Sequence, residues 1–272
     1  PPSPPTSITL DGGTMQFGSG MPLDSNRSVQ LQTGTTGGID TSGHNVGIPG
    51  AIGGGGTLVK KGGGWLILSG ANDYTGGTMI DGGGIRTRAT NSLGAGGSLE
   101  VAGGCTLDLN GYNVAVGALR GATGAGVTND GTSSVATLTS DFTGNAIFAG
   151  TLSDGPSQAL SLTKNGTGKL VLSGTNTYTG NTTVNGGKLV VDGSIAGAAV
   201  IDGGVLGGSG TVGGTTSMAD GTAVSPGGSI GTLTIDDDLV LGSGGTGVNF
   251  DFEATSGSLY DQLIVTGDLQ AN

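Results

Sequence analysis

The sequence predicts an all-β fold, a parallel β-helix in which short strands stack as successive coils. Residues 58–85 and 162–189 are two copies of one segment and are identical at 15 of 28 positions without a gap. Glycine supplies 62 of the 272 residues, and the apolar residues between the glycines alternate as they do in strands. A spaced internal repeat in a glycine-rich, β-patterned chain is typical of a solenoid, in which each unit buries its apolar face on its neighbours.

A recurring unit of two glycines followed by an alternating strand sets the length of one coil. Glycine supplies the positive φ that such a turn requires. Neighbouring units lie 21 residues apart at Gly82 and Gly103, and 17 apart at Gly186 and Gly203. Roughly a dozen such coils would fill the chain, forming a rod roughly 60 Å long at about 4.8 Å per stacked strand. The unit occurs at 11–15, 81–85, 102–105, 185–189 and 202–206.

The chain divides into three expected segments. Residues 1–7 form a proline-rich lead-in, and residues 8–220 form the coils. Residues 221–272 read as two or three longer strands with added aromatic bulk at Phe250, Phe252 and Tyr260. The open end of a solenoid needs cover, because exposed strand edges recruit other chains, so we expect 221–272 to be a C-terminal cap. Within the coils, residues 118–158 are expected to be a looser, irregular stretch.

Alignment of the two copies predicts which way the side chains point. Leu66 and Leu68 match Leu170 and Leu172, so these four leucines are expected in the core. Trp65 matches Lys169, a position that accepts a charge and is therefore expected to face solvent. Both assignments agree with the alternation of side chains along a strand.

A polar turn is expected after each of these strands. Asn72 and Tyr74 in the first copy match Asn176 and Tyr178 in the second. An asparagine at such a turn can close onto the local backbone or stack in a ladder with its neighbours. Both arrangements fit the sequence.

Composition excludes several classes of partner and site. The chain has 20 Asp and Glu against 9 Lys and Arg, a net charge of −11. Nucleic acids and anionic membranes bind basic surfaces, so neither is expected as a partner. Cys105 is the one cysteine, which excludes an intramolecular disulfide, and its parity with Leu107 and Leu109 predicts an inward side chain. No apolar run of 18 residues occurs, and because the chain starts at Pro1 without a signal peptide, we expect a processed or excised piece.

Candidates for catalysis and metal binding are few. Ser229 stands in a Gly-x-Ser-x-Gly pattern, but the one histidine, His44, precedes it by 185 residues, whereas that motif needs a later histidine. One histidine and one cysteine exclude the usual zinc sites. The run 236–238 is Asp-Asp-Asp and could bind calcium, although a solvated turn is the favoured interpretation. We therefore expect no catalytic residue, no metal and no cofactor.

Three residues are candidates for surface contacts. Arg86 and Arg88 are spaced by two and should lie on one outer face, where they could bind a sulfated glycan or a carboxylate. Trp65, beside Ile67, could contact a sugar or a protein. The alternative interpretations are that the arginines are edge-protecting charges and that the tryptophan is an isolated surface residue.

The repeat resembles a known family. Residues 162–180 read Leu-Thr-Lys-x-Gly-x-Gly-x-Leu-x-Leu-Ser-Gly-x-Asn-Thr-Tyr-Thr-Gly, and residues 58–76 follow the same pattern more loosely. This pattern is similar to the passenger-associated transport repeat of bacterial autotransporters. The runs at 225–233 and 260–267 are similar to the closing section of such passengers. The resemblance implies a right-handed parallel β-helix, exported through its own outer-membrane barrel, with C-terminal coils that act as the folding nucleus.

The resemblance also guides the expected function. Since no barrel lies in this chain, the full-length protein is expected to be tethered to one at the bacterial surface. We expect a non-enzymatic adhesin or self-association module that binds a host cell-surface or matrix protein, a glycan, or another copy of itself. Its contacts would come from polar side chains and loops, particularly 118–158. One alternative is a structural stalk and folding nucleus for a distal domain absent here, and another is a carbohydrate-active enzyme on a β-helix.

Overall fold

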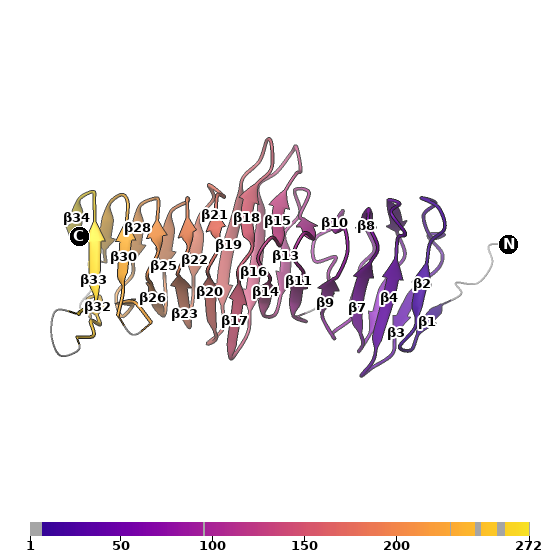
Figure 1. Cartoon of the computed structure of the whole chain (residues 1–272), viewed down its shortest axis with the longest axis horizontal. Helices are drawn as coiled ribbons and strands as arrows, with labels where there is room; N and C mark the ends of the chain where they lie inside the picture. The colour runs from indigo at the N-terminus through magenta and orange to yellow at the C-terminus, as the bar shows by residue number, and fades with distance from the viewer. Residues whose placement is uncertain (1–6, 95, 229, 243–245, 255–258, 272) are drawn as a thin grey trace.

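The computed structural model describes residues 7–94, 96–228, 230–242, 246–254 and 259–271. These residues are all-β, and their parallel sheets stack as a β-solenoid of about 11 turns. Figure 1 shows an elongated rod with the first and last described strands at opposite tips. The parallel β-helix predicted from the repeat is confirmed, and the turn count is close to the predicted dozen. The described residues contain no helix with the length and hydropathy needed to cross a membrane.

Each coil passes through three faces of the solenoid. The first face is one 12-stranded sheet that runs the length of the rod. Its strands are β2 (Thr14–Gln16), β4 (Thr36–Asp40), β7 (Thr57–Lys61), β9 (Thr78–Ile80), β11 (Leu99–Val101), β14 (Leu119–Gly121), β17 (Asn145–Phe148), β20 (Lys169–Leu172), β23 (Lys188–Val191), β26 (Val205–Gly208), β29 (Ala223–Pro226) and β32 (Asn249–Phe250).

The second face is built from two sheets in succession. Its six-stranded sheet contains β5 (Val46–Ile48), β8 (Trp65–Leu68), β10 (Gly84–Thr87), β12 (Thr106–Asp108), β15 (Gly126–Asn129) and β18 (Thr151–Asp154). Its five-stranded sheet contains β21 (Thr175–Asn176), β24 (Ser194–Ile195), β27 (Thr211–Val212), β30 (Thr232–Ile235) and β33 (Gln262–Val265). The face is continuous because β18 lies against β21.

The third face is divided in the same way. Its first sheet contains β1 (Ile8–Leu10), β3 (Val29–Leu31) and β6 (Ile52–Gly54). Its second contains β13 (Val114–Val116), β16 (Ala136–Asp141), β19 (Leu160–Asn165), β22 (Thr182–Val184), β25 (Ala199–Ile201), β28 (Thr216–Met218), β31 (Leu239–Leu241) and β34 (Leu269–Ala271).

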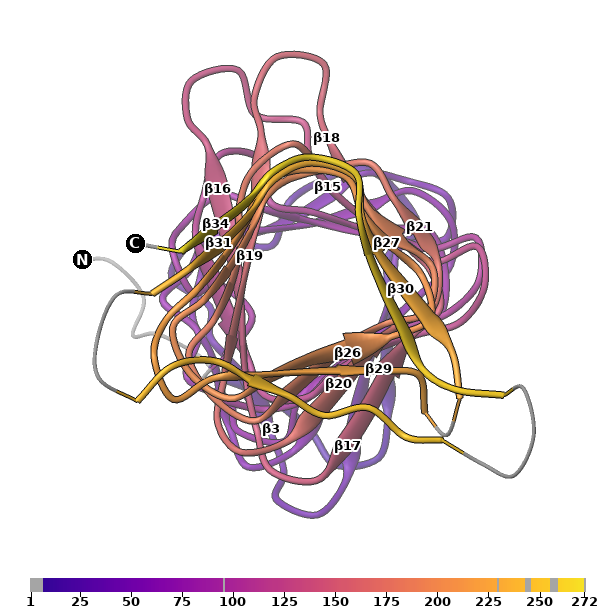
Figure 2. The ribbon, with the colours of Figure 1, turned by 90° about the vertical axis from the view of Figure 1, so that its left-hand side faces the viewer.

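The coils wind in a right-handed sense. In the end-on view of Figure 2 the C-terminal end faces the viewer. The chain passes from β29 at the bottom through β30 at the right to β31 at the upper left, anticlockwise while it approaches the viewer. This is the hand implied by the resemblance and the usual hand of a crossover between parallel strands.

The core is a column of aligned apolar side chains. Leu66, Leu68, Leu170 and Leu172 are completely buried, as predicted, and Cys105 is buried among them. Parallel pairing in register places the leucines of one coil over those of the next, for example Leu170 over Leu189. Burial of each such side chain contributes about 1.5–3 kcal/mol.

The predicted polar turns are buried connections between coils. Asn72 accepts a hydrogen bond from the backbone N–H of Ile52, 2.7 Å away, and donates to the carbonyl of Ser92, 2.6 Å away. Asn176 bonds in the same way to Leu152 on one side and Ser194 on the other. These bonds go to the backbone of adjacent coils and not to a ladder of stacked asparagines, and Asn176 also donates to the carbonyl of Gly174 in its own turn, 3.1 Å away.

The two repeat tyrosines lie in the core rather than at exposed turns. Tyr74 and Tyr178 have no exposed surface. Their hydroxyl groups pair with the hydroxyls of Thr78 and Thr182, four residues later in each copy. Burial raises the pKa of both phenols well above the usual value.

Two lysines are buried at corners of the coil, a feature that the sequence analysis did not predict. Lys60 has no exposed surface and donates to the carbonyls of Lys61, Gly62 and Gly82, at 2.7–2.9 Å. Burial lowers the pKa of its amine to about 8, so it remains mostly protonated at neutral pH.

Lys164 occupies the same place in the second repeat copy. It donates to the carbonyls of Asn165, Gly166 and Gly186, and its ammonium lies 4.9 Å from the ring centre of Phe142. In both copies the third carbonyl belongs to the next coil. Each lysine therefore donates hydrogen bonds to carbonyl groups at a corner and links two successive coils.

The two repeat copies lie on different faces. The first copy uses β7 and β9 on the first face and β8 and β10 on the second. The second copy uses β19 and β22 on the third face, β20 and β23 on the first, and β21 on the second. Each copy therefore spans slightly more than one full coil, and the second copy begins one face earlier along the coil than the first.

Residues 118–158 are more regular than predicted. They contain β14 to β18, which pair in parallel with strands of neighbouring coils, although β18 is hydrogen-bonded to β15 alone. The loops 130–135 and 155–159 leave the stack, and they stand out from the end-on outline near β16 and β18 (Figure 2). The irregularity in the sequence reflects two long loops rather than a break in the solenoid.

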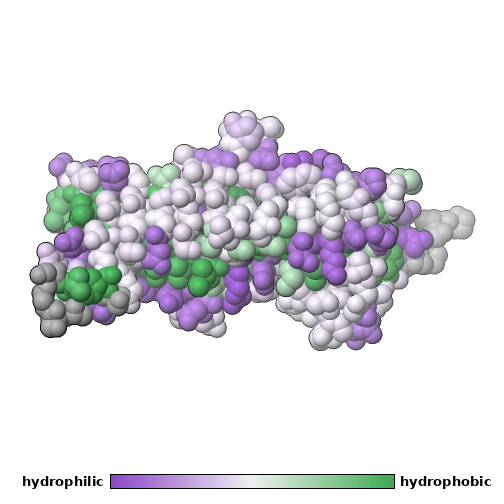
Figure 3. All heavy atoms as spheres, viewed as in Figure 1, coloured by the Kyte–Doolittle hydropathy of each residue, from purple (hydrophilic) through white to green (hydrophobic). Residues whose placement is uncertain are grey.

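The described part of 221–272 continues the same stack. The strands β29 to β34 are two to four residues long, so the prediction of longer strands is wrong. Phe250 and Leu269 pair with the buried residues Val224 and Leu239, yet they remain 42% and 65% exposed. Figure 3 shows apolar atoms gathered at this end. The described residues therefore leave the core open here, and the role of 221–272 as cap and folding nucleus stays a prediction.

Replacement of a corner lysine should weaken the fold locally. Lys164→Met leaves three partly buried carbonyl groups without this donor, so we expect the free energy of unfolding to fall by about 1–3 kcal/mol. Hydrogen exchange of amides in the coils around residues 160–190 measures this effect. Lys169→Met, at an exposed position, is the control and should change stability by less than about 0.5 kcal/mol. Equal effects of the two substitutions would contradict the corner role.

Alkaline pH should unfold the protein through its buried tyrosines. An unfolded chain releases phenol protons from about pH 10, whereas the folded chain retains those of Tyr74 and Tyr178. The unfolded state then binds fewer protons, so stability falls by about 1.4 kcal/mol per pH unit for each tyrosine. Tyr178→Phe should reduce this slope in denaturant titrations above pH 10. Tyr112→Phe, at an exposed tyrosine, should leave it unchanged.

Candidate functional site

The candidate contact residues lie on the outer side of the second face. Strands β8, β10, β12 and β15 are neighbours there, and their register aligns the outward positions in rows. One row contains Ile67, Arg86, Asp108 and Thr128. The adjacent row begins with Trp65 and continues through Gly84, Thr106 and Gly126.

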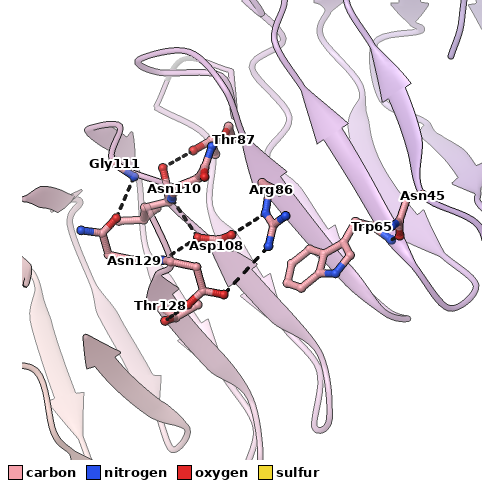
Figure 4. Close-up of polar contacts among 11 residues, drawn as sticks. Asn45, Trp65, Arg86, Thr87, Asp108, Asn110, Gly111, Thr128 and Asn129 are labelled. Carbon is pink, nitrogen blue, oxygen red and sulfur yellow. Dashed lines mark hydrogen bonds and ion pairs between the residues drawn. The ribbon is translucent and has the colours of Figure 1, made fainter. Parts of the chain in front are cut away.

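Trp65 points outward, as predicted, but it is partly buried against the sheet. A Cβ atom added at Gly84 would overlap the ring carbons of Trp65, so the indole lies directly on this glycine. The guanidinium of Arg86 lies 4.8 Å from the ring centre, a cation–π contact (Figure 4). The indole therefore packs flat against Gly84, where no side chain intervenes, and the guanidinium of Arg86 restricts its position.

Arg86 is held by acidic partners. Its Nε lies 2.6 Å from Oδ2 of Asp108, which has no exposed surface, and its Nη2 lies 3.9 Å from Oδ2 of Asp130. The second oxygen of Asp108 accepts hydrogen bonds from the backbone N–H groups of Asn110 and Asp130, at 2.8 and 3.0 Å. Asp108 thus orders two successive corners, and Arg86 neutralises its buried charge.

Arg88 is in a different environment, although it lies on the same side of the chain. It follows β10, is exposed, and makes no side-chain hydrogen bond or ion pair with any described residue. It lines an open recess of about 350 Å³ at the corner between the second and third faces. The other lining residues are Asn110, Gly111, Tyr112, Gly131, Thr132, Ser133 and Ser134. The two arginines therefore do not act as a pair. Arg86 is bound to Asp108 and Trp65, whereas the Arg88 side chain has no partner among the described residues.

Buried Asn129 holds the two walls of this recess in place. Its oxygen accepts from the N–H of Gly111, 2.7 Å away (Figure 4). Its amide group donates to the carbonyl of Ser134 at 3.1 Å. Positive φ values at Asn110 and Gly111 make the tight corner on one wall. Gly131 packs directly on that backbone, and a side chain there would clash.

The other chemical candidates are placed as follows. The carboxylates of 236–238 accept hydrogen bonds from neighbouring coils, including Thr266 to Asp236 and Thr215 to Asp237. Among the described residues, no three His, Cys, Asp or Glu side chains form a cluster suited to a metal ion. His44 lies at an exposed turn, and Ser229 lies outside the described residues.

Comparison with known families identifies the repeats. The family model of the passenger-associated-transport-repeat matches residues 58–86 and 162–191. The chain thus carries two such repeats, and together with the β-solenoid they support an autotransporter passenger domain. Repeats of this kind imply a secreted, cell-surface or outer-membrane-associated protein. A search of curated protein sequences finds no match to the chain.

The matched segments cover only part of the candidate site. Trp65, Gly84 and Arg86 lie within the first match, whereas Arg88 and the rest of the recess lie outside both. Asp108 and Asn129 were missed by sequence reasoning. A signal existed for Asp108, because it follows Arg86 by 22 residues, about one coil, and has opposite charge.

The packing of the indole on Gly84 can be tested by replacing this glycine with a larger residue. Gly84→Val should displace Trp65 and shift its fluorescence emission to longer wavelength, since Trp65 is the single tryptophan of the chain. We expect a loss of stability of roughly 1–3 kcal/mol from overpacking. Gly126→Val lies in the same row away from the indole and is the control, with unchanged emission. Unchanged emission in Gly84→Val would show that the indole lies elsewhere.

Proposed function

We propose that this chain is a non-enzymatic adhesion module displayed at the bacterial surface. The observation that carries the proposal is the recess lined by loop 130–135, with its preorganised walls and with Arg88, which has no side-chain partner among the described residues. A rigid stack keeps these groups at a fixed position on a long rod, which suits attachment better than a single flexible loop does. The expected partner is a host surface or matrix component, and self-association between cells is the variant of the same function.

A structural stalk is the second candidate. The regular stack and the open apolar end at Phe250 and Leu269 favour it, because both suit a spacer that continues into other structure. On this alternative the surface residues have no ligand of their own.

Binding assays separate the two candidates. Purified 1–272 is applied to cultured host cells, to immobilised matrix proteins and to surface-bound copies of itself. We expect saturable binding that falls at least about tenfold, or about 1.4 kcal/mol, when residues 131–134 are replaced by a short glycine linker. The control replaces exposed Lys169 and Asn145 on the first face by alanine.

Three outcomes would contradict the proposal. Absence of binding across the panel would favour the stalk. Equal binding by the loop variant and the control would place adhesion elsewhere on the rod. Turnover of an acidic polysaccharide that is lost on chelation would indicate an enzyme instead.

A further inference from the structure

We propose that the recess lined by Arg88, Tyr112 and residues 131–134 binds an anionic sugar, a pyranose ring that carries a carboxylate or a sulfate. This inference rests on the proposed adhesion function and names the class of ligand. It assigns the binding role to Arg88 and gives Arg86 a positioning role through Asp108.

The recess is assembled from three successive coils. Arg88 comes from the end of β10, Asn110 to Tyr112 from the corner after β12, and residues 131–134 from the loop after β15. Asp108 and Asn129, both completely buried, hold these segments from behind through backbone hydrogen bonds. Its volume of about 350 Å³ lies within the range of small-ligand sites.

Charge favours an anion at this place. Among the described residues that line the recess there is no carboxylate, and Asp130, next to lining residue Gly131, directs its carboxylate toward Arg86 and the hydroxyl of Thr128. Arg88 therefore presents its guanidinium without an acidic partner among the described residues, in a chain with a net charge of −11. A guanidinium binds planar carboxylates in a bidentate manner and also pairs with the oxygens of a sulfate.

The rest of the lining favours a sugar. Tyr112 is 36% exposed and offers one ring for contact with the apolar face of a pyranose. The hydroxyl groups of Thr132, Ser133 and Ser134 make no hydrogen bond with described residues and can serve sugar hydroxyls. Apart from Tyr112 the lining offers no large apolar side chain, so an apolar peptide or a lipid tail has little to bury here.

Calorimetric titration of 1–272 tests the ligand class. The probes are glucuronic acid, N-acetylneuraminic acid, glucose 6-sulfate, neutral glucose and an oligoglutamate peptide. We expect binding of an acidic sugar and none of glucose. The carboxylate and sulfate probes show which anion is preferred, and binding of the peptide without the sugars would overturn the inference.

Three substitutions test the residues. Arg88→Gln should weaken acidic-sugar binding at least about tenfold, and Tyr112→Ala about tenfold, because each removes one principal contact. Arg27→Gln removes the same charge from another exposed corner and should leave binding unchanged. The emission of Trp65 verifies that each variant keeps the fold. Equal losses in Arg88→Gln and Arg27→Gln would show nonspecific attraction and overturn the inference.

The inference and the adhesion proposal fail in different ways. If 1–272 adheres to cells or matrix, and Arg88→Gln adheres equally while no acidic sugar binds, the recess is not a sugar site and adhesion stands. If neither adhesion nor sugar binding occurs, both proposals are overturned.

Discussion

The structure depends on satisfying the peptide groups at the corners where each coil changes face. Strand pairing satisfies the backbone along the faces, but a corner leaves carbonyls that point toward the core or the next coil, and an unpaired buried peptide group is costly. Lys60 and Lys164 each serve three of these carbonyls, and Asn72 and Asn176 bridge coils on either side. In this chain each of the two matched repeats supplies such a lysine and asparagine together with the apolar strands beside them.

The same principle produces the candidate site. Asp108 and Asn129 lie outside the two repeats but play the same role at their corners. Each forms hydrogen bonds with the backbone of two segments. Arg86 neutralises the charge of Asp108 from the solvent side, so Arg88 is not needed for that purpose. The buried side chains Asp108 and Asn129 thus fix the backbone of the recess, while Arg88 can contact a ligand there.

The sequence predicted side-chain burial correctly where the alternation of residues along one strand determines which side chains point into the core. Alignment of the two copies placed Leu66, Leu68, Leu170 and Leu172 in the core, and strand parity with Leu107 and Leu109 placed Cys105 there. Glycine spacing indicated the coil length. Sequence reasoning missed features that depend on two coils at once. The burial of the lysines is explained only by the carbonyls of the next coil, and the ring of Tyr74 lies against Gly94 of the next coil. Residues 118–158 read as irregular because loop length masks a regular stack.

The displacement of the second repeat copy by one face has a geometric consequence for the whole rod. The repeat occurs here in two of the three possible orientations, so a chain of this kind can lengthen or shorten by a third of a turn and still keep its leucine column. Such a change would rotate every loop that follows it by one face around the long axis of the rod. Modest insertions could therefore re-aim surface features toward a different neighbour while the interior stays as it is.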